Sequence, residues 1–238
     1  MPCPVTNSHI SGDALVDALV GAFSPAGRLP TTMYTPDIIA RDIRDVDLAS
    51  SGGITHTWFD GPVLFPFGYG LSYAQFSFSM QFRGLETQKW SVVLDESGSC
   101  IQGCAESKLL HVRMTNSGDS SSAPSDCVLL VFIDRAVAAS DAQLQSTSST
   151  PSSHSPREAL VAFQRFHSIA PGDSLDHHFT LEYNSVFAAF RNEHGRVQPP
   201  QGTYQLRIGH SRGESGARLT VTVASSFDGV ATGGLETL

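Results

Sequence analysis

Acidic side chains are the first candidates for catalysis in this sequence, because two carboxyl groups in contrasting environments can serve as acid and base. Asp42, Asp45 and Asp47 lie close together and alternate with Arg41 and Arg44. Mixed charges of this kind in a stretch without hydrophobic periodicity are typical of a solvated loop. Nothing in the sequence places two carboxyl groups in different environments, so we predict no catalytic residue in this chain.

Histidines are the next candidates, since the chain contains nine of them and imidazole binds metals. His177 and His178 are adjacent on a predicted strand, so their rings should point to opposite faces and not share one ion. The other histidines are scattered over different elements. We therefore predict neither a metal site nor a cofactor.

Cysteines offer a third kind of chemistry at positions 3, 100, 104 and 127. Cys100 and Cys104 can close a small disulfide loop in an oxidising compartment, and free thiols fit the sequence equally well. A zinc site would need a second ligand pair at a similar spacing, which the sequence does not offer. The pairing and the compartment both stay open at this point.

Aromatic residues gather between positions 58 and 73: Trp58, Phe59, Phe65, Phe67, Tyr69 and Tyr73. We expect most of them to pack a connecting segment against its neighbours, with glycines between them allowing tight turns. The alternative is that Trp58 or Phe59 borders a sugar pocket as a stacking surface. Packing is the favoured interpretation.

Composition excludes two classes of partner. The 238 residues carry a formal net charge of −8, and the basic residues form no cluster, which argues against a nucleic-acid partner. The sequence has no apolar run of the roughly 20 residues that a membrane-spanning helix needs. Its first residues also lack the basic and apolar regions of a signal peptide, so localisation is not predicted.

The elements that would position these groups fall into three parts. Residues 11–20 predict one amphipathic helix, with Ser11 as N-cap and Gly21 at C′. Residues 31–64 form a long connection with few periodic features, including a short strand-like piece at His56–Phe59. From about residue 75 the sequence predicts roughly seven strands of an immunoglobulin-like sandwich. We place these strands near 76–82, 110–114, 128–133, 160–166, 178–182, 204–208 and 219–223.

Two sequence blocks carry a family resemblance. The first contains Gly27, Arg28, Leu29 and Pro30, and the second contains Pro66, Phe67, Gly68, Tyr69 and Gly70. In order and separation they resemble the end of the α/β sandwich domain and the entry to the fibronectin type III-like domain of glycoside hydrolase family 3. The stretch from Pro62 to Gly68 favours the β-xylosidase branch.

The resemblance implies a mainly β fold: a fibronectin type III-like sandwich preceded by a short helix and a long strap left over from an α/β domain. It divides the chain into a remnant of the α/β domain (1–30), an interdomain strap (31–74), the sandwich (75–226) with a disordered insertion at 138–155, and a tail (227–238).

The resemblance also bears on activity. In that family the nucleophilic aspartate and the acid/base glutamate lie upstream of the helix that opens this chain. Hydrolysis by this chain alone is therefore not expected, and its expected partners are the catalytic domains of the same enzyme, with a glycan as a second candidate. The family's secretion would depend on a signal in the parent protein. Two alternatives stay open: a free-standing module that binds carbohydrate or protein, and an incomplete gene model of a longer protein.

Overall fold

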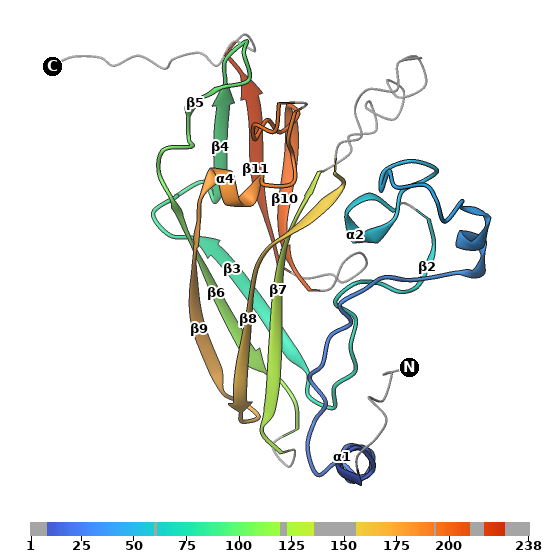
Figure 1. The fold of residues 1–238 in the computed structure, drawn as a ribbon. Helices are drawn as coiled ribbons and strands as arrows, with labels where there is room; N and C mark the ends of the chain where they lie inside the picture. The colour runs from blue at the N-terminus through green and yellow to red at the C-terminus, as the bar shows by residue number, and fades with distance from the viewer. Residues whose placement is uncertain are drawn as a thin grey trace, which may run out of the picture.

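The structure is a computed structural model that describes residues 9–59, 61–119, 123–135, 156–192, 194–209 and 217–226. A β-sandwich forms the larger part, and the N-terminal helix and strap lie beside it (Figure 1). The helices are α1 (His9–Leu19), the 3-10 helix η1 (Pro36–Ala40), α2 (Thr55–Trp58) and α4 (Tyr183–Val186). The strap strands are β1 (Met33–Tyr34) and β2 (Val63–Phe65). The sandwich strands are β3 (Phe76–Phe82), β4 (Lys89–Leu94), β5 (Cys100–Gln102), β6 (Lys108–Asn116), β7 (Ser125–Arg135), β8 (Glu158–Ile169), β9 (Ser174–Leu181), β10 (Gly202–Ile208) and β11 (Arg218–Ser225).

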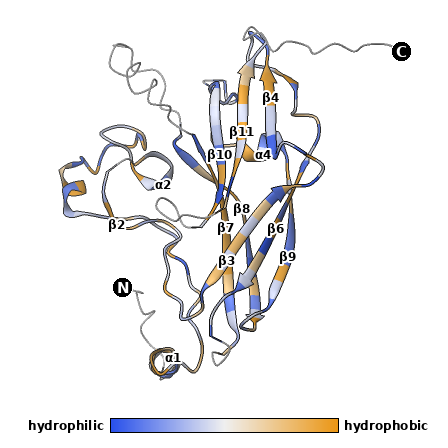
Figure 2. Ribbon diagram, turned by 180° about the vertical axis from the view of Figure 1, so that it is seen from behind, coloured by the Kyte–Doolittle hydropathy of each residue, from blue (hydrophilic) through white to orange (hydrophobic). Residues whose placement is uncertain are grey.

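The sandwich consists of two sheets. One has six strands in the order β5-β4-β11-β10-β7-β8, and the other has three in the order β3-β6-β9. Strands pair antiparallel throughout these sheets except β4 and β11, which are parallel. Hydrophobic and hydrophilic positions alternate along several strands (Figure 2). This mainly β sandwich confirms the predicted fold class.

Alternation in the sequence explains the small sheet. In β3, phenylalanine and methionine alternate with serine and glutamine, and the less exposed side chains are those of the apolar residues. The register pairs Phe82 of β3 with Leu110 of β6, and both side chains are buried in the main core. Each strand therefore gives one face to the core and one to solvent, as the period of two requires.

Strand β7 is apolar on both faces, and the structure shows why. Leu129, Val131 and Ile133 point into the main core between the sheets. Phe132 points the other way and is nevertheless fully buried, because it contacts rings of the strap. The prediction of a central strand is confirmed, and its outer face is covered by the strap.

Several elements differ from the prediction. Strands β4 and β5 and helix α4 were not predicted, and the predicted strand-like piece at His56–Phe59 is wrong because Thr55–Trp58 form helix α2. Helix α1 begins at His9, so Ser11 lies inside the helix and the predicted N-cap is also wrong. Gly21 does take the left-handed conformation (φ 78°) expected at C′.

The expected insertion at 138–155 and tail at 227–238 lie outside the described residues. No helix among the described residues is long and apolar enough to cross a membrane.

Candidate functional site

The two sequence blocks meet in space and form what we call the clasp, made of residues 27–30 and 66–70. The amide of Leu29 donates to the carbonyl of Tyr69 at 2.8 Å, and the amide of Gly68 donates to the carbonyl of Leu29 at 2.8 Å. Gly68 has a φ of 78°, which permits the turn that returns the chain to Leu29. The residues that carry the family resemblance are thus a structural motif held by main-chain hydrogen bonds.

Glycine is required inside the clasp because the two backbones touch. A Cβ atom on Gly70 would overlap the carbonyl oxygen of Gly27, whereas one on Gly27 would meet nothing within 4 Å. The Phe65 and Tyr69 rings lie beside this crossing with their centroids 4.9 Å apart. The clasp therefore depends on a close backbone approach at residue 70.

Residues that flank the clasp fix helix α1 to the strap. The Tyr73 hydroxyl donates to the carbonyl of Ala18 at 2.9 Å, and the Ser24 and Ser72 hydroxyls are 2.9 Å apart. The helix itself exposes its apolar side chains, with Leu15 at 56% and Leu19 at 70% of full exposure. A helix this short is not stable alone in water, so its free apolar face calls for a covering surface.

Beyond the clasp the strap is a closed antiparallel ribbon rather than a structureless connection. Strand β1 pairs with β2, with Met33 opposite Phe65. The Tyr34 hydroxyl accepts the amide hydrogen of Thr55 at 2.6 Å, and its ring packs edge-on against Phe59 at 4.8 Å. The residues between β1 and β2 are thereby held as one unit.

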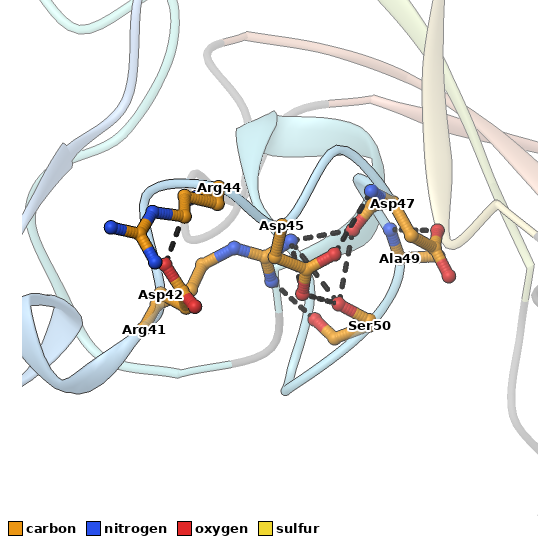
Figure 3. Close-up of polar contacts among 7 residues, drawn as sticks. All are labelled: Arg41, Asp42, Arg44, Asp45, Asp47, Ala49 and Ser50. Carbon is orange, nitrogen blue, oxygen red and sulfur yellow. Dashed lines mark hydrogen bonds and ion pairs between the residues drawn. The ribbon is translucent and has the colours of Figure 1, made fainter.

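The tip of the strap, residues 39–50, is organised around one arginine, and we call it the Arg41 loop; Figure 3 shows its polar contacts. The Arg41 guanidinium donates to the carbonyls of Asp47 and Ser50 and forms an ion pair with Asp45 at 3.2 Å. The Ser50 hydroxyl, followed by backbone amides, holds the pKa of Asp45 below its ordinary value. The acidic residues thus cap their own loop.

The same loop turns its apolar residues outward. Ile39, Ile43 and Val46 are 82%, 97% and 90% exposed, while the Arg41 side chain is only 9% exposed. This inverts the usual arrangement, in which apolar groups are buried and charges face water. Large exposed apolar patches of this kind typically mark interaction sites.

The strap packs against a patch of the sandwich around Phe132. The His56 ring of α2 stacks on Phe67 at 4.2 Å, and both rings contact Phe132 of β7 edge-on at about 6 Å. The amide of Arg157 donates to the carbonyl of Thr57 at 2.9 Å. Burial, followed by the nearby guanidinium of Arg207, lowers the pKa of His56.

Beneath this patch lies an ion triad that the sequence did not predict. Arg207 of β10 contacts Asp134 of β7 at 2.5 Å and Glu158 of β8 at 2.6 Å, and its guanidinium lies 4.7 Å from the Phe132 ring centre. Arg207 and Glu158 are each 3% exposed. Asp134 and Glu158 are paired across neighbouring strands, so register alone brings them together. The Glu158 carboxylate is buried against this cation and the Asp134 carboxylate is partly buried against it, with the Asp134 side chain 26% exposed, so the three groups form a structural centre.

Comparisons with known proteins agree with this geometry. The fibronectin type III-like domain family matches residues 142–212. A probable exo-1,4-beta-xylosidase, bxlB of Aspergillus fumigatus, is 29% identical over 221 residues, which are 90% of this chain and 26% of that protein. The exo-1,4-beta-xylosidase xlnD of Emericella nidulans is 27% identical over 84% of this chain and 24% of its own length.

Solved structures match over the same span. A GH3 exo-beta-xylosidase, XlnD, has a TM-score of 0.65 at 23% identity, covering 90% of this chain and 26% of that one. The beta-D-glucoside glucohydrolase of Trichoderma reesei has a TM-score of 0.60 at 23% identity, covering 91% of this chain and 29% of that one. The chain resembles the C-terminal part of glycoside hydrolase family 3 enzymes. It spans about a quarter of the length of the relatives it matches.

The predicted sugar contacts of this family 3-like chain lie on the strap. Phe59 packs against Tyr34, and a Cβ atom on Gly61 would overlap the Phe59 ring, so its immediate surroundings are protein. Trp58 is half-buried, and its carbonyl is close enough to Gly53 to exclude any side chain there. Phe59 therefore packs within the strap, and sugar stacking by Trp58 or Phe59 stays a prediction.

The remaining candidates lie apart from the strap. Cys100 and Cys104 form a disulfide with their Cα atoms 6.2 Å apart, while Cys127 is a buried free thiol whose pKa is raised to about 11, chiefly by burial. His177 packs against Phe166 and Phe179, and His178 stacks on His111, so the two rings do point to opposite faces. Within the described ranges, no group of three or more histidine, cysteine or acidic side chains could hold a metal ion.

Proposed function

We propose that this chain is the C-terminal bracing region of a retaining exo-β-glycosidase of the β-xylosidase type, and that it contributes neither nucleophile nor acid/base. In this proposal α1 and the Arg41 loop contact the other domains of the enzyme, and the sandwich holds the strap in place. The similarity to an exo-1,4-beta-xylosidase and to a probable exo-1,4-beta-xylosidase supports the enzyme class.

One observation carries the bracing role: the Arg41 loop is ordered by internal polar bonds and yet presents Ile39, Ile43 and Val46 to solvent. A loop that served only as a solvated linker would gain nothing from exposed isoleucines, because burying an isoleucine side chain would contribute about 1.5–3 kcal/mol to stability. A surface built this way is suited to an apolar face on another domain.

The absence of a catalytic role rests on the carboxylates. Retaining glycosidases need two carboxyl groups about 5–5.5 Å apart on either side of a bond that the substrate can place between them. The Asp45 carboxylate is engaged with Ser50 and Arg41, and Asp134 and Glu158 are engaged with a buried arginine. All three carboxylates are engaged by an arginine, which supports a structural role for each.

The rival function is a free-standing module that binds carbohydrate or protein. The half-buried Trp58 and the exposed Tyr73 favour it, because exposed aromatic rings are common in binding surfaces. In the brace, the apolar tip of the strap contacts another domain of the same polypeptide, whereas a free-standing module has no such domain. The mass of the polypeptide made by the source cells therefore distinguishes the two functions.

The experiment is an intact-mass measurement of that polypeptide, combined with hydrolysis of p-nitrophenyl β-xyloside. The brace predicts a product much heavier than 25.5 kDa that hydrolyses the xyloside. In that product Ile43→Asp should lower stability by about 2 kcal/mol, because a buried isoleucine is lost. Ile101→Asp on β5 is the matched control, since Ile101 is also exposed and lies away from the strap. A mature product of 25.5 kDa, or equal effects of the two substitutions, would refute the brace.

A further inference from the structure

Helix α4 and strand β5 lie on the side of the sandwich away from the strap (Figure 1). Residues of both elements line a polar hollow. Its volume is about 580 Å³, within the range of ligand sites. The Cys100–Cys104 disulfide lies on one side, and the segment from Arg191 to Gln198 lies on the other. None of these residues takes part in the strap contacts described above.

The walls of the hollow are fixed by hydrogen bonds. Oδ1 of Asn192 accepts the amide hydrogens of His194 and Arg196, both at 3.0 Å, and its Nδ2 donates to Oε1 of Gln198 at 2.8 Å. The Arg191 guanidinium donates to two backbone carbonyls of the same segment. Gln198 then lies against Gly98, where a Cβ atom would clash with the amide. A ligand would meet a preformed surface, which reduces the entropy cost of binding.

Three side chains leave hydrogen-bonding groups free toward this hollow. Within the described part of the chain, the Arg196 guanidinium, Nε2 of Gln198 and the side-chain amide of Asn184 have no hydrogen-bond partner in the protein. The described lining residues include two arginines and no aspartate or glutamate. The hollow is therefore rich in donors and locally basic, on a chain whose formal net charge is −8.

We propose that this hollow binds a short acidic oligosaccharide, with the carboxylate of a uronic acid residue on Arg196 and ring hydroxyls on Gln198 and Asn184. Guanidinium groups pair with carboxylates in a bidentate geometry, and amides both donate to and accept from hydroxyl groups. The volume exceeds the need of a bare inorganic anion, and the ring of Tyr183 is buried, which leaves no open platform for a nucleobase.

A second hollow adjoins the first and determines which end of the oligosaccharide lies in which hollow. It has a volume of about 620 Å³ and shares Gly98 and Gln198 with its neighbour, but its lining includes two carboxylates, Asp95 and Glu96, against one arginine, Arg135. Carboxylates repel a uronate, so the acidic residue should occupy the Arg196 side and neutral sugars the Asp95 side. Gln198, which separates the two, would contact both parts of the ligand.

The test is calorimetric titration of the full chain with an aldotetrauronic acid, which joins one uronic acid to three neutral sugars, and with xylotetraose as a neutral oligosaccharide of the same length. We expect the acidic tetrasaccharide to bind at least about ten times more tightly, since one charge-assisted pair contributes about 1.5–3 kcal/mol. Arg196→Gln should weaken it by about tenfold, and Asn184→Ala by about fivefold. Arg83→Gln is the matched control, because Arg83 is an exposed arginine just after β3 and away from the hollow.

Three results would overturn the proposal. They are equal binding of the acidic and neutral tetrasaccharides, an unchanged affinity in Arg196→Gln, and competition by inorganic phosphate as strong as that by the tetrasaccharide. The last would mark a simple anion site. Melting curves check that each variant folds, and the Arg196 and Asn184 variants serve as independent readouts. The outcome is separate from the bracing role, which concerns the opposite side of the molecule.

Discussion

The ion triad under the strap gives the sharpest prediction, which is the substitution Arg207→Met. Arg207 is 3% exposed and forms two ion pairs, with Asp134 at 2.5 Å and with Glu158 at 2.6 Å. Methionine fills similar volume but removes this cation from both carboxylates, in a site where the Glu158 side chain is 5% exposed and the Asp134 side chain is 26% exposed. Breaking a buried pair from one side costs about 3–5 kcal/mol. Two charge-assisted hydrogen bonds of about 1.5–3 kcal/mol each give a similar figure.

The assay is urea unfolding of the full chain followed by fluorescence of Trp90, whose side chain is 1% exposed in the sandwich core. We expect Arg207→Met to lower the free energy of unfolding by about 4 kcal/mol. On heating, the midpoint should fall by roughly 10 °C for a chain of this size. Arg218→Met is the matched control on the neighbouring strand, because Arg218 is exposed and makes one side-chain hydrogen bond, to Gln205 at 3.0 Å. It should cost less than about 0.5 kcal/mol.

A rescue separates lost charge compensation from lost packing. Adding Asp134→Asn and Glu158→Gln to Arg207→Met removes the uncompensated charges and should recover part of the lost stability. A loss below about 1 kcal/mol for Arg207→Met would refute the reasoning, as would a loss that the rescue leaves unchanged.

Three further predictions concern the strap and the disulfide. The pKa of His56 is lowered in the folded chain, first by burial and then by the guanidinium of Arg207, so the unfolded chain binds the proton more readily. The contribution of His56 to stability should therefore be complete above about pH 6.5 and should fall as the pH drops below that value. In a pH titration of the urea midpoint, His56→Gln should flatten this fall. Gly70→Ala should destabilise the clasp while Gly27→Ala is tolerated, and equal melting temperatures for the two would contradict the backbone contact. Replacing Cys100 and Cys104 by serine should cost about 2 kcal/mol by the loop-entropy estimate, measured against the same chain under reducing conditions, where the difference should vanish.

Strong alternation made most of the sandwich predictable. Phe76 to Phe82 and Leu110 to Met114 each show apolar residues at every second position, and both segments are strands. Strand β4 was not predicted because the sequence Trp90-Ser-Val-Val-Leu94 breaks the alternation with two adjacent valines. Helix α4 is a single turn whose core contacts, such as those of Tyr183 and Phe187, depend on tertiary packing and not on a local pattern.

The site was less predictable than the fold, because its contacts join distant segments. The residues of the clasp were identified from family resemblance, but their mutual hydrogen bonds join Leu29 to Tyr69 and Gly68, far along the chain. Asp134, Glu158 and Arg207 come from three different strands, and only the sheet register brings them together. A polar residue within an apolar strand, as at Arg207 between Leu206 and Ile208, was the available signal of a buried charge.

The strap and the sandwich are stabilised by opposite arrangements, and this difference bears on function. Phe132 is an outward-facing residue that stays buried because His56 and Phe67 cover it, so the inner side of the strap is satisfied by the sandwich. On the outer side Arg41 is held within the loop while Ile43 is 97% exposed. A strap that only needed to pack on the sandwich would have no reason to order a loop pointing away from it. The physical asymmetry is therefore that of a segment with two apolar contacts, one made within this chain and one directed outward, which is the arrangement expected of a brace between domains.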